Sequence, residues 1–353
     1  MTAAARGGTT LTAVSAIHFF VDLACIFLVT SSFPAENWLF YVVLYNFCAF
    51  ALQLPLGVVC DRRSAPLFPA VCGCVLVALA YPLTAFLPIG GCLAAGLGNA
   101  LFHIGGGVAV MRAFPKTASP LGIFVSPGAL GVFFGVFCAR EGLAVTYLFP
   151  LLLLVCAAVL AIVRRREGEG AFVPREDGGL SLSPGGFAAA GAALLFFAVV
   201  LRSWFGLIVT LPWKTGFLLP FLFVVGVAAG KVLGGLVGDR LGLRGGAVTT
   251  LALSALLFLF AEGSPAAGIA AICCYNMTMP LTLFALGEIC GEAKGFAFGL
   301  TTFALFLGTL PTLLPISPKT ADPALLVPLV VLAAVLICGG VALARKGGGK
   351  GVS

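Results

Sequence analysis

The two histidines of this 353-residue chain both stand inside apolar sequence, close to other polar residues. His18 precedes Asp22 by four residues in the stretch AIHFFVDLAC. His103 follows Asn99 by four residues in a second apolar stretch. Four residues make about one helical turn, so each pair shares a helix face. Imidazole and carboxylate groups exchange protons and also bind transition metals. The spacing therefore predicts a cluster that carries protons or binds a metal.

The composition indicates the kind of element that positions these residues. The chain is 61% hydrophobic and 9% charged, with a mean hydropathy of +1.15, whereas a soluble domain has about 25% charged residues. Apolar runs of about 20 residues, the length that crosses a bilayer as a helix, recur along the chain. We expect an all-α integral membrane protein. Its twelve predicted spans are 11–30, 38–59, 66–86, 88–111, 120–139, 144–163, 187–210, 215–237, 246–261, 265–287, 295–315 and 323–344.

A repeated loop motif divides these spans into two sets of six. The pattern G-x-x-x-D-R follows the second span and again the eighth, where it is formed by Gly57, Asp61, Arg62, Gly235, Asp239 and Arg240. The long polar segment between the repeats covers 164–186. We therefore predict two pseudo-symmetric six-helix bundles, 1–163 and 187–353, joined by a cytoplasmic linker at 164–186.

The basic residues predict the orientation of the spans. With the N-terminus inside, only Arg140, Lys214 and Lys319 fall on the outer side. The positive-inside rule then puts both termini in the cytoplasm of a multi-pass protein of the cell membrane. This topology explains the formal charge of +7 without a nucleic-acid partner, and membrane lipid is the expected surrounding.

The loop motif resembles that of the major facilitator superfamily. Within it, the chain is most similar to fosmidomycin-resistance-type exporters, on the basis of His18-x-x-x-Asp22, Phe102-His103 with Gly105-Gly106, and Arg202-Ser203. The resemblance implies two six-helix halves that work by alternating access. It also implies that spans 1, 4, 7 and 10 surround a central cavity.

Ionisable residues within spans are costly and face a cavity or the bundle interior. Asp22 is either a carboxylate that titrates during transport or the structural partner of Arg202. His18 and His103 either carry protons and contact substrate or serve as hydrogen-bonding groups, with Asn99 on the same face as His103. Arg202 is the candidate for binding an anion, since a guanidinium pairs bidentately with a carboxylate or phosphonate. Possible secondary residues are Lys231, which could instead reach the inner surface, and Glu288.

The repeated motif predicts gating rather than chemistry. Asp61 and Asp239 stand at helix boundaries, where a carboxylate can interact with the N-terminal dipole of a following helix. Arg62 and Arg240 are expected to bond helix-end carbonyls. Breaking such contacts would bias inward-open against outward-open states.

Nothing in the sequence predicts an enzyme or a cofactor, because it has no phosphate-binding loop and no long soluble segment. The favoured function is secondary active transport of a small organic solute, drug-like or anionic, as proton-coupled export by a monomer. The alternative is a divalent transition-metal transporter that uses His18, Asp22 and His103. A non-transporting receptor or scaffold is the third hypothesis.

Overall fold

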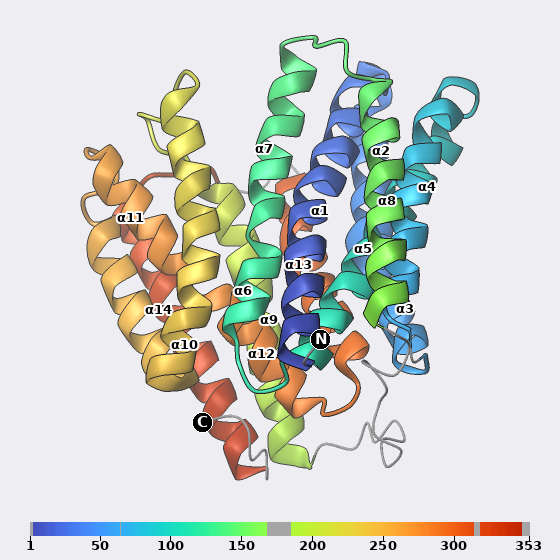
Figure 1. Cartoon of the computed structure of the whole chain (residues 1–353). Helices are drawn as coiled ribbons and strands as arrows, with labels where there is room; N and C mark the ends of the chain where they lie inside the picture. Colours follow the sequence, from blue (N-terminus) through green and yellow to red (C-terminus); the bar gives the residue numbers. More distant parts are fainter. Residues whose placement is uncertain (1–2, 64, 168–184, 314–317, 348–353) are drawn as a thin grey trace. The chain divides into compact units, whose positions relative to one another are not determined.

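The computed structural model describes residues 3–63, 65–167, 185–313 and 318–347, and all of its long elements are helices (Figure 1). The predicted linker lies largely outside the described residues. The first half of the chain forms α1 (Ala3–Ser31), η1 (Ala35–Asn37), α2 (Trp38–Asn46), η2 (Phe47–Ala51), α3 (Gln53–Asp61), α4 (Leu67–Phe86), α5 (Pro88–Ala113), α6 (Ser119–Val125), α7 (Pro127–Arg140) and α8 (Leu148–Glu167). The second half forms α9 (Gly186–Ile208), α10 (Leu218–Phe258), α11 (Pro265–Asn276), α12 (Thr278–Ile289), α13 (Lys294–Leu313) and α14 (Pro323–Lys346).

Eleven helical segments among these residues are long and apolar enough to cross a membrane. Helices suit a bilayer because each satisfies its own backbone hydrogen bonds. The eighth and ninth predicted spans both lie in α10, whose 41 residues comprise two helices that meet at the non-helical Gly242, so the eleven segments are consistent with the twelve predicted spans. Gly242 has a φ of 72°, which glycine adopts without steric cost. The predicted loop there is reduced to this one kink.

Three other spans depart from a regular α-helix. The fifth is broken between α6 and α7, where Pro127 cannot donate a backbone hydrogen bond. The tenth changes from α11 to α12 at Met277. The second contains the π-helical turn η2, and such turns are frequent at functional sites.

The chain divides into two compact units. Unit 1 comprises Met1–Pro115, Pro127–Gly179 and Glu292–Phe303, and unit 2 comprises Lys116–Ser126, Leu180–Gly291 and Ala304–Ser353. In unit 1, α1 packs along α7 and also contacts α5 and α8, while α4 packs along α5. In unit 2, α10 packs on α11, α14 and α6, and α9 packs on α14 and α12. The fifth span and α13 each contribute to both units.

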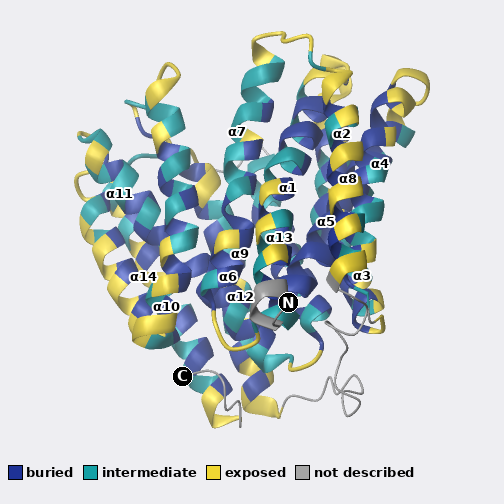
Figure 2. Cartoon of the chain, viewed as in Figure 1, coloured by how far each residue is buried: buried dark blue, intermediate teal, exposed yellow. Residues whose placement is uncertain are grey.

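Burial separates the helices that can position a site from those that face lipid. Most of α5 is buried, whereas α8 carries a run of exposed residues (Figure 2). Before its basic last turn, α8 exposes large apolar residues, which include Leu151, Leu154, Val155, Val159 and Ile162. An exposed apolar face of this kind is what a membrane-spanning helix presents to hydrocarbon.

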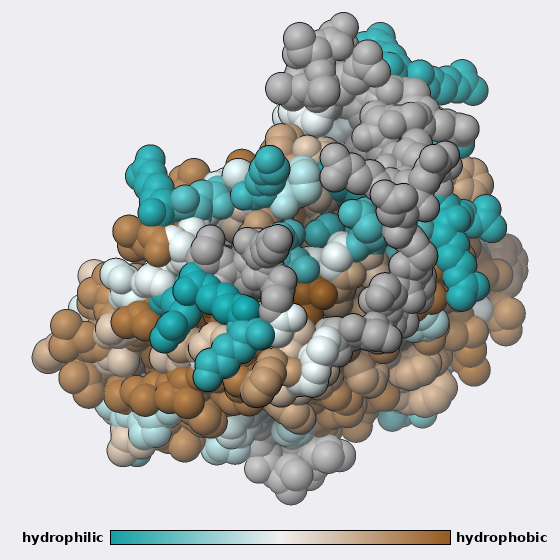
Figure 3. Space-filling model, turned by 90° about the horizontal axis from the view of Figure 1, so that it is seen from below, coloured by the Kyte–Doolittle hydropathy of each residue, from teal (hydrophilic) through white to brown (hydrophobic). Residues whose placement is uncertain are grey.

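Hydrophilic side chains gather on the face seen from below, which is bordered by apolar side chains (Figure 3). Basic residues occupy the last turns of α5, α8 and α14. Cations at a helix C-terminus interact favourably with the helix dipole, so these residues stabilise the helix ends as well as carrying the topology signal.

Candidate functional site

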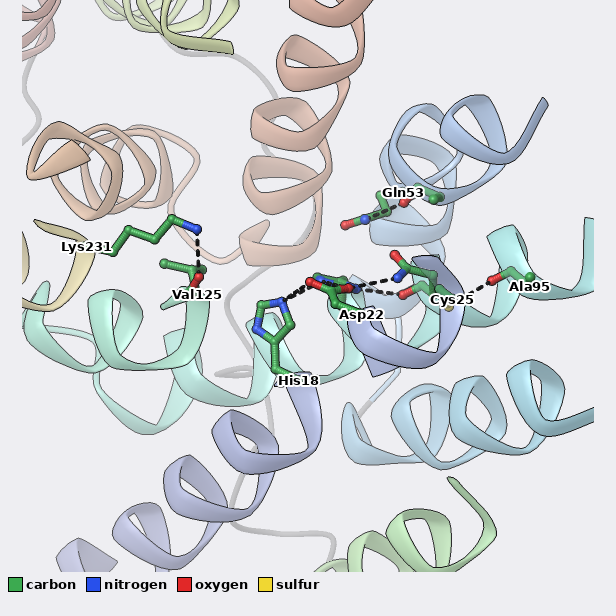
Figure 4. Close-up of polar contacts among 10 residues, drawn as sticks. His18, Asp22, Cys25, Gln53, Ala95, Val125 and Lys231 are labelled. Carbon is green, nitrogen blue, oxygen red and sulfur yellow. Dashed lines mark hydrogen bonds and ion pairs between the residues drawn. The ribbon is translucent and has the colours of Figure 1, made fainter. Parts of the chain in front are cut away.

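Helix α1 brings the first predicted pair together on one face. His18 Nε2 lies 3.2 Å from Asp22 Oδ2, and the two side chains point toward one another (Figure 4). His18 is 4% exposed, and the Asp22 side chain is 15% exposed. The spacing of four residues on a helix produces this contact.

Helix α5 supplies the other two predicted residues of the cluster. Asn99 Nδ2 donates to Asp22 Oδ1 at 3.0 Å. His103 Nε2 lies 2.8 Å from His18 Nε2 and 3.6 Å from Asp22 Oδ1. His103 Nδ1 lies 2.9 Å from the backbone oxygen of Asn99. All four residues therefore form one connected polar network in unit 1, as their positions predicted.

The hydrogen bonds assign the protons of this network. The backbone carbonyl of Asn99 can only accept, so His103 Nδ1 carries a proton. In a neutral His103 the Nε2 atom is then an acceptor. His18 Nε2 faces this acceptor and the Asp22 carboxylate. If His18 Nε2 carries a proton, that proton serves two acceptors, His103 Nε2 and the Asp22 carboxylate. If it does not, the lone pairs of the two imidazoles and of the carboxylate face one another. A cation shared by these atoms, either a proton or a metal ion, would relieve the crowding of their lone pairs.

A glycine of α7 fits closely against this network. A Cβ added at Gly128 would lie 2.8 Å from His18 Cδ2 and closer still to His18 Nε2 and Asp22 Oδ2. Gly131 and Gly135, on the same helix, approach the backbone of α1 in a similar way. The absence of side chains along this edge lets α7 pack against the polar face of α1.

The predicted anion-binding residue belongs to unit 2. Arg202 on α9 is 9% exposed, and its Nε and Nη2 atoms have no hydrogen-bond partner among the described residues. Tyr275 on α11, which the sequence did not single out, is 1% exposed, and its hydroxyl also has no partner within the described chain. Arg202 lies in unit 2 and Asp22 in unit 1, and their convergence stays a prediction.

The first loop motif connects α3 to the start of α13 within unit 1. Asp61 accepts hydrogen bonds from the backbone nitrogens of Gly295 at 2.7 Å and Phe296 at 2.8 Å. One turn earlier, Gly57 packs so closely that an added Cβ would overlap the Gly295 carbonyl. The predicted contact with a helix N-terminus is present, but the helix is α13 rather than the one that follows in the chain.

The second loop motif repeats this arrangement in unit 2. Asp239 accepts hydrogen bonds from the backbone nitrogens of Ala118 at 2.6 Å and Ser119 at 3.1 Å, at the start of α6. The Ser119 hydroxyl donates to the same carboxylate. A Cβ on Gly235 would lie 2.5 Å from Ser119 Cα. Each glycine thus brings two helices together, and the aspartate one turn later caps the partner helix.

The predicted bonds from the motif arginines to helix-end carbonyls are not found among the described residues. Arg62 and Arg240 are exposed. The carbonyl contacts are made instead by Arg112 at the end of α5, which donates to Arg63 O at 3.0 Å and lies 3.7 Å from the Asp61 carboxylate. The sequence alone did not indicate this role for Arg112, because its partner Asp61 lies 51 residues away.

Of the two secondary residues, Lys231 contacts a helix end and Glu288 lies at one. Lys231 Nζ donates to the carbonyl oxygen of Val125 at 3.0 Å. This carbonyl ends α6 immediately before the break at Pro127. Lys231 therefore stabilises an interrupted helix. Glu288 lies in the last turn of α12 and is half-buried.

Comparison of the whole chain with solved structures identifies its fold. A variant of the E. coli fucose:proton symporter FucP matches with a TM-score of 0.61 and 14% identity, covering 96% of this chain and 98% of that protein. A bacterial homologue of the iron transporter ferroportin, in an outward-facing state with soaked iron, matches with a TM-score of 0.59 and 16% identity, covering 97% and 99%. The chain has the major facilitator fold.

The major facilitator fold accounts for the all-helical architecture predicted from the sequence. No protein-family model matches the chain, and no curated protein matches it. The resemblance to fosmidomycin-resistance-type exporters therefore stays a prediction. With this fold and its apolar helices, the chain is a multi-pass membrane protein.

Proposed function

We propose that the protein is a secondary active transporter that exports a small organic solute across the cytoplasmic membrane, with both termini inside, and couples this movement to protons. The observation that carries the proposal is the network of His18, Asp22, Asn99 and His103, in which one proton on His18 Nε2 serves two acceptors. The major facilitator fold supports the transporter assignment. The sequence resemblance favours export.

The network suits proton coupling because its ionisable groups lie close enough for their charges to interact. Two imidazoles and a carboxylate lie within 4.8 Å of one another, so the charge on each changes the proton affinity of the others. A change of conformation that alters exposure of Asp22 would load or release a proton. We assign Asp22 as the proton carrier, His18 and His103 as its partners, and Arg202 as a residue that binds substrate.

The two motif aspartates would control the conformational step. Asp61 caps α13, and Asp239 caps α6, by equivalent contacts in the two sequence repeats. We assign these caps as latches that break and re-form during alternating access. Each latch uses charge-assisted hydrogen bonds to backbone N–H groups, which are stronger than neutral bonds but exchange readily with water when exposed.

The second candidate substrate is a divalent transition metal, favoured by the convergence of ligand atoms from His18, Asp22 and His103. Two Nε2 atoms 2.8 Å apart would subtend about 85° at a metal about 2.1 Å from each. Two histidines and one carboxylate form a ligand set that suits iron(II). In this case the metal ion would itself be the cargo.

Proteoliposomes with an entrapped pH-sensitive dye distinguish the two candidates. Organic solutes and Mn²⁺, Fe²⁺ or Zn²⁺ are added in turn under an imposed pH gradient. We expect an organic solute to move protons in wild-type vesicles and not in Asp22→Asn vesicles. Metal uptake that is independent of the gradient, with no proton movement by any organic solute, would overturn the main proposal in favour of the second.

A further inference from the structure

Unit 2 contains the buried guanidinium group of Arg202. The donor nitrogens without a partner among the described residues lie along one edge of this planar group. Arg202 is 9% exposed, and Nε and Nη2 are the two atoms without a hydrogen-bond partner among the described residues. These two nitrogens direct parallel N–H bonds to the same side of the planar group, and this edge matches two oxygens of one anion. A buried donor pair of this kind needs a partner.

A second buried group without a partner among the described residues lies near Arg202, on α11. The Tyr275 ring packs on Phe205 with ring centroids 4.2 Å apart. Phe205 is three residues after Arg202, so it lies on the same face of α9. Arg202 and Tyr275 interact electrostatically. The Tyr275 hydroxyl, itself without a partner in the described chain, supplies a third donor.

We propose that Arg202 and Tyr275 form an oxyanion site that takes the carboxylate or phosphonate of the transported solute. An oxyanion accepts from the two nitrogens of Arg202 and from the phenol at once, whereas a neutral amide or alcohol cannot pair with all three donors. Phe205 packs edge-to-face against Phe258 with centroids 5.3 Å apart, and these rings give the site an apolar wall. The inference rests on the proposed function because it names the chemical class of the solute.

Binding to the purified full-length protein tests this site without a proton gradient. The probes are benzoate and phenylphosphonate, with benzamide as the neutral counterpart, and apparent affinity is read from the rise in melting temperature. We expect the two anions, but not benzamide, to stabilise the wild type. Arg202→Lys should weaken anion binding by about tenfold or more, because the planar fork is lost, and Tyr275→Phe by about tenfold.

Tyr81→Phe is the matched control. The Tyr81 hydroxyl is buried in unit 1 and donates to Ala24 O at 2.8 Å, so its loss should lower stability without changing anion affinity. If Arg202→Lys does not fold, the comparison of Tyr275→Phe with Tyr81→Phe still decides the question.

Three results would overturn the site: equal stabilisation by benzamide, unchanged anion affinity in Tyr275→Phe and Arg202→Lys, or binding that appears only in Asp22→Asn. Binding that appears only in Asp22→Asn would show that the Asp22 carboxylate competes with the anion for the two nitrogens of Arg202. Anion binding that survives while Asp22→Asn retains full proton coupling would contradict the proposed proton carrier and leave the oxyanion site intact.

Discussion

Replacement of Gly128 by alanine should disrupt the polar network of His18, Asp22, Asn99 and His103 without removing any of its titratable groups. The added Cβ would lie 2.8 Å from His18 Cδ2, whereas ordinary van der Waals contact begins at 3.4 Å. The His18 ring must therefore retreat by at least about 0.6 Å. The backbone can stay in place because the obstructing atoms belong to the side chains of His18 and Asp22.

This shift weakens the contacts that hold the network. The His18–His103 distance of 2.8 Å would lengthen beyond the about 3.2 Å at which such hydrogen bonds lose strength. Loss of one or two bonds to charged groups costs about 2–4 kcal/mol in total. We expect the melting temperature of the purified protein to fall by roughly 4–8 °C.

A double-mutant cycle isolates the cause. In a background of His18→Ala and Asp22→Ala the obstructing atoms are gone, so Gly128→Ala should cost little there. Gly206→Ala is the control, since an added Cβ on this helical glycine meets nothing within 4 Å. An equal loss of stability from Gly128→Ala in both backgrounds would refute the proposed contact between α7 and the network.

The other predictions concern the latches and the interrupted helix. Asp61→Asn should lower stability by about 1 kcal/mol and slow transport, because the charge at the α13 N-terminus is lost; unchanged rates in vesicles would remove its gating role. Asp239→Asn should have a similar effect through α6, measured the same way. Gly57→Ala should reduce the folded yield sharply, since its Cβ would meet backbone atoms of Gly295 that cannot retreat; normal expression and stability would contradict this packing. Lys231→Met should destabilise the end of α6 yet leave substrate affinity unchanged, and a loss of affinity would instead place Lys231 in the substrate site.

The sequence predicted the elements of unit 1 well because helical periodicity acts over short distances. His18 and Asp22 share a face, and so do Asn99 and His103, for a reason that one turn of helix already contains. Their meeting across α1 and α5 was expected from the cost of exposing such groups to lipid. The distances themselves depend on packing, including the approach of Gly128.

Contacts between distant segments could not be predicted in the same way. The motif aspartates were expected to cap a following helix, yet Asp61 caps α13, 234 residues later. Arg112 and Tyr275 are unremarkable in the sequence, since an arginine at a helix end and a tyrosine in a span are common. By contrast, the break in α10 at Gly242 falls between the eighth and ninth predicted spans, as expected.

The most direct test of the central claim uses the fact that the chain has two histidines, both in the network. Protein labelled with ¹³C at histidine, with any purification tag removed, gives two imidazole signals, both of which report on this site. Shared protonation predicts that the two signals titrate as a coupled pair with pH, and that Asp22→Asn changes the titration of both. Two independent titrations near the unperturbed value of about 6.5, unaffected by Asp22→Asn, would contradict the account.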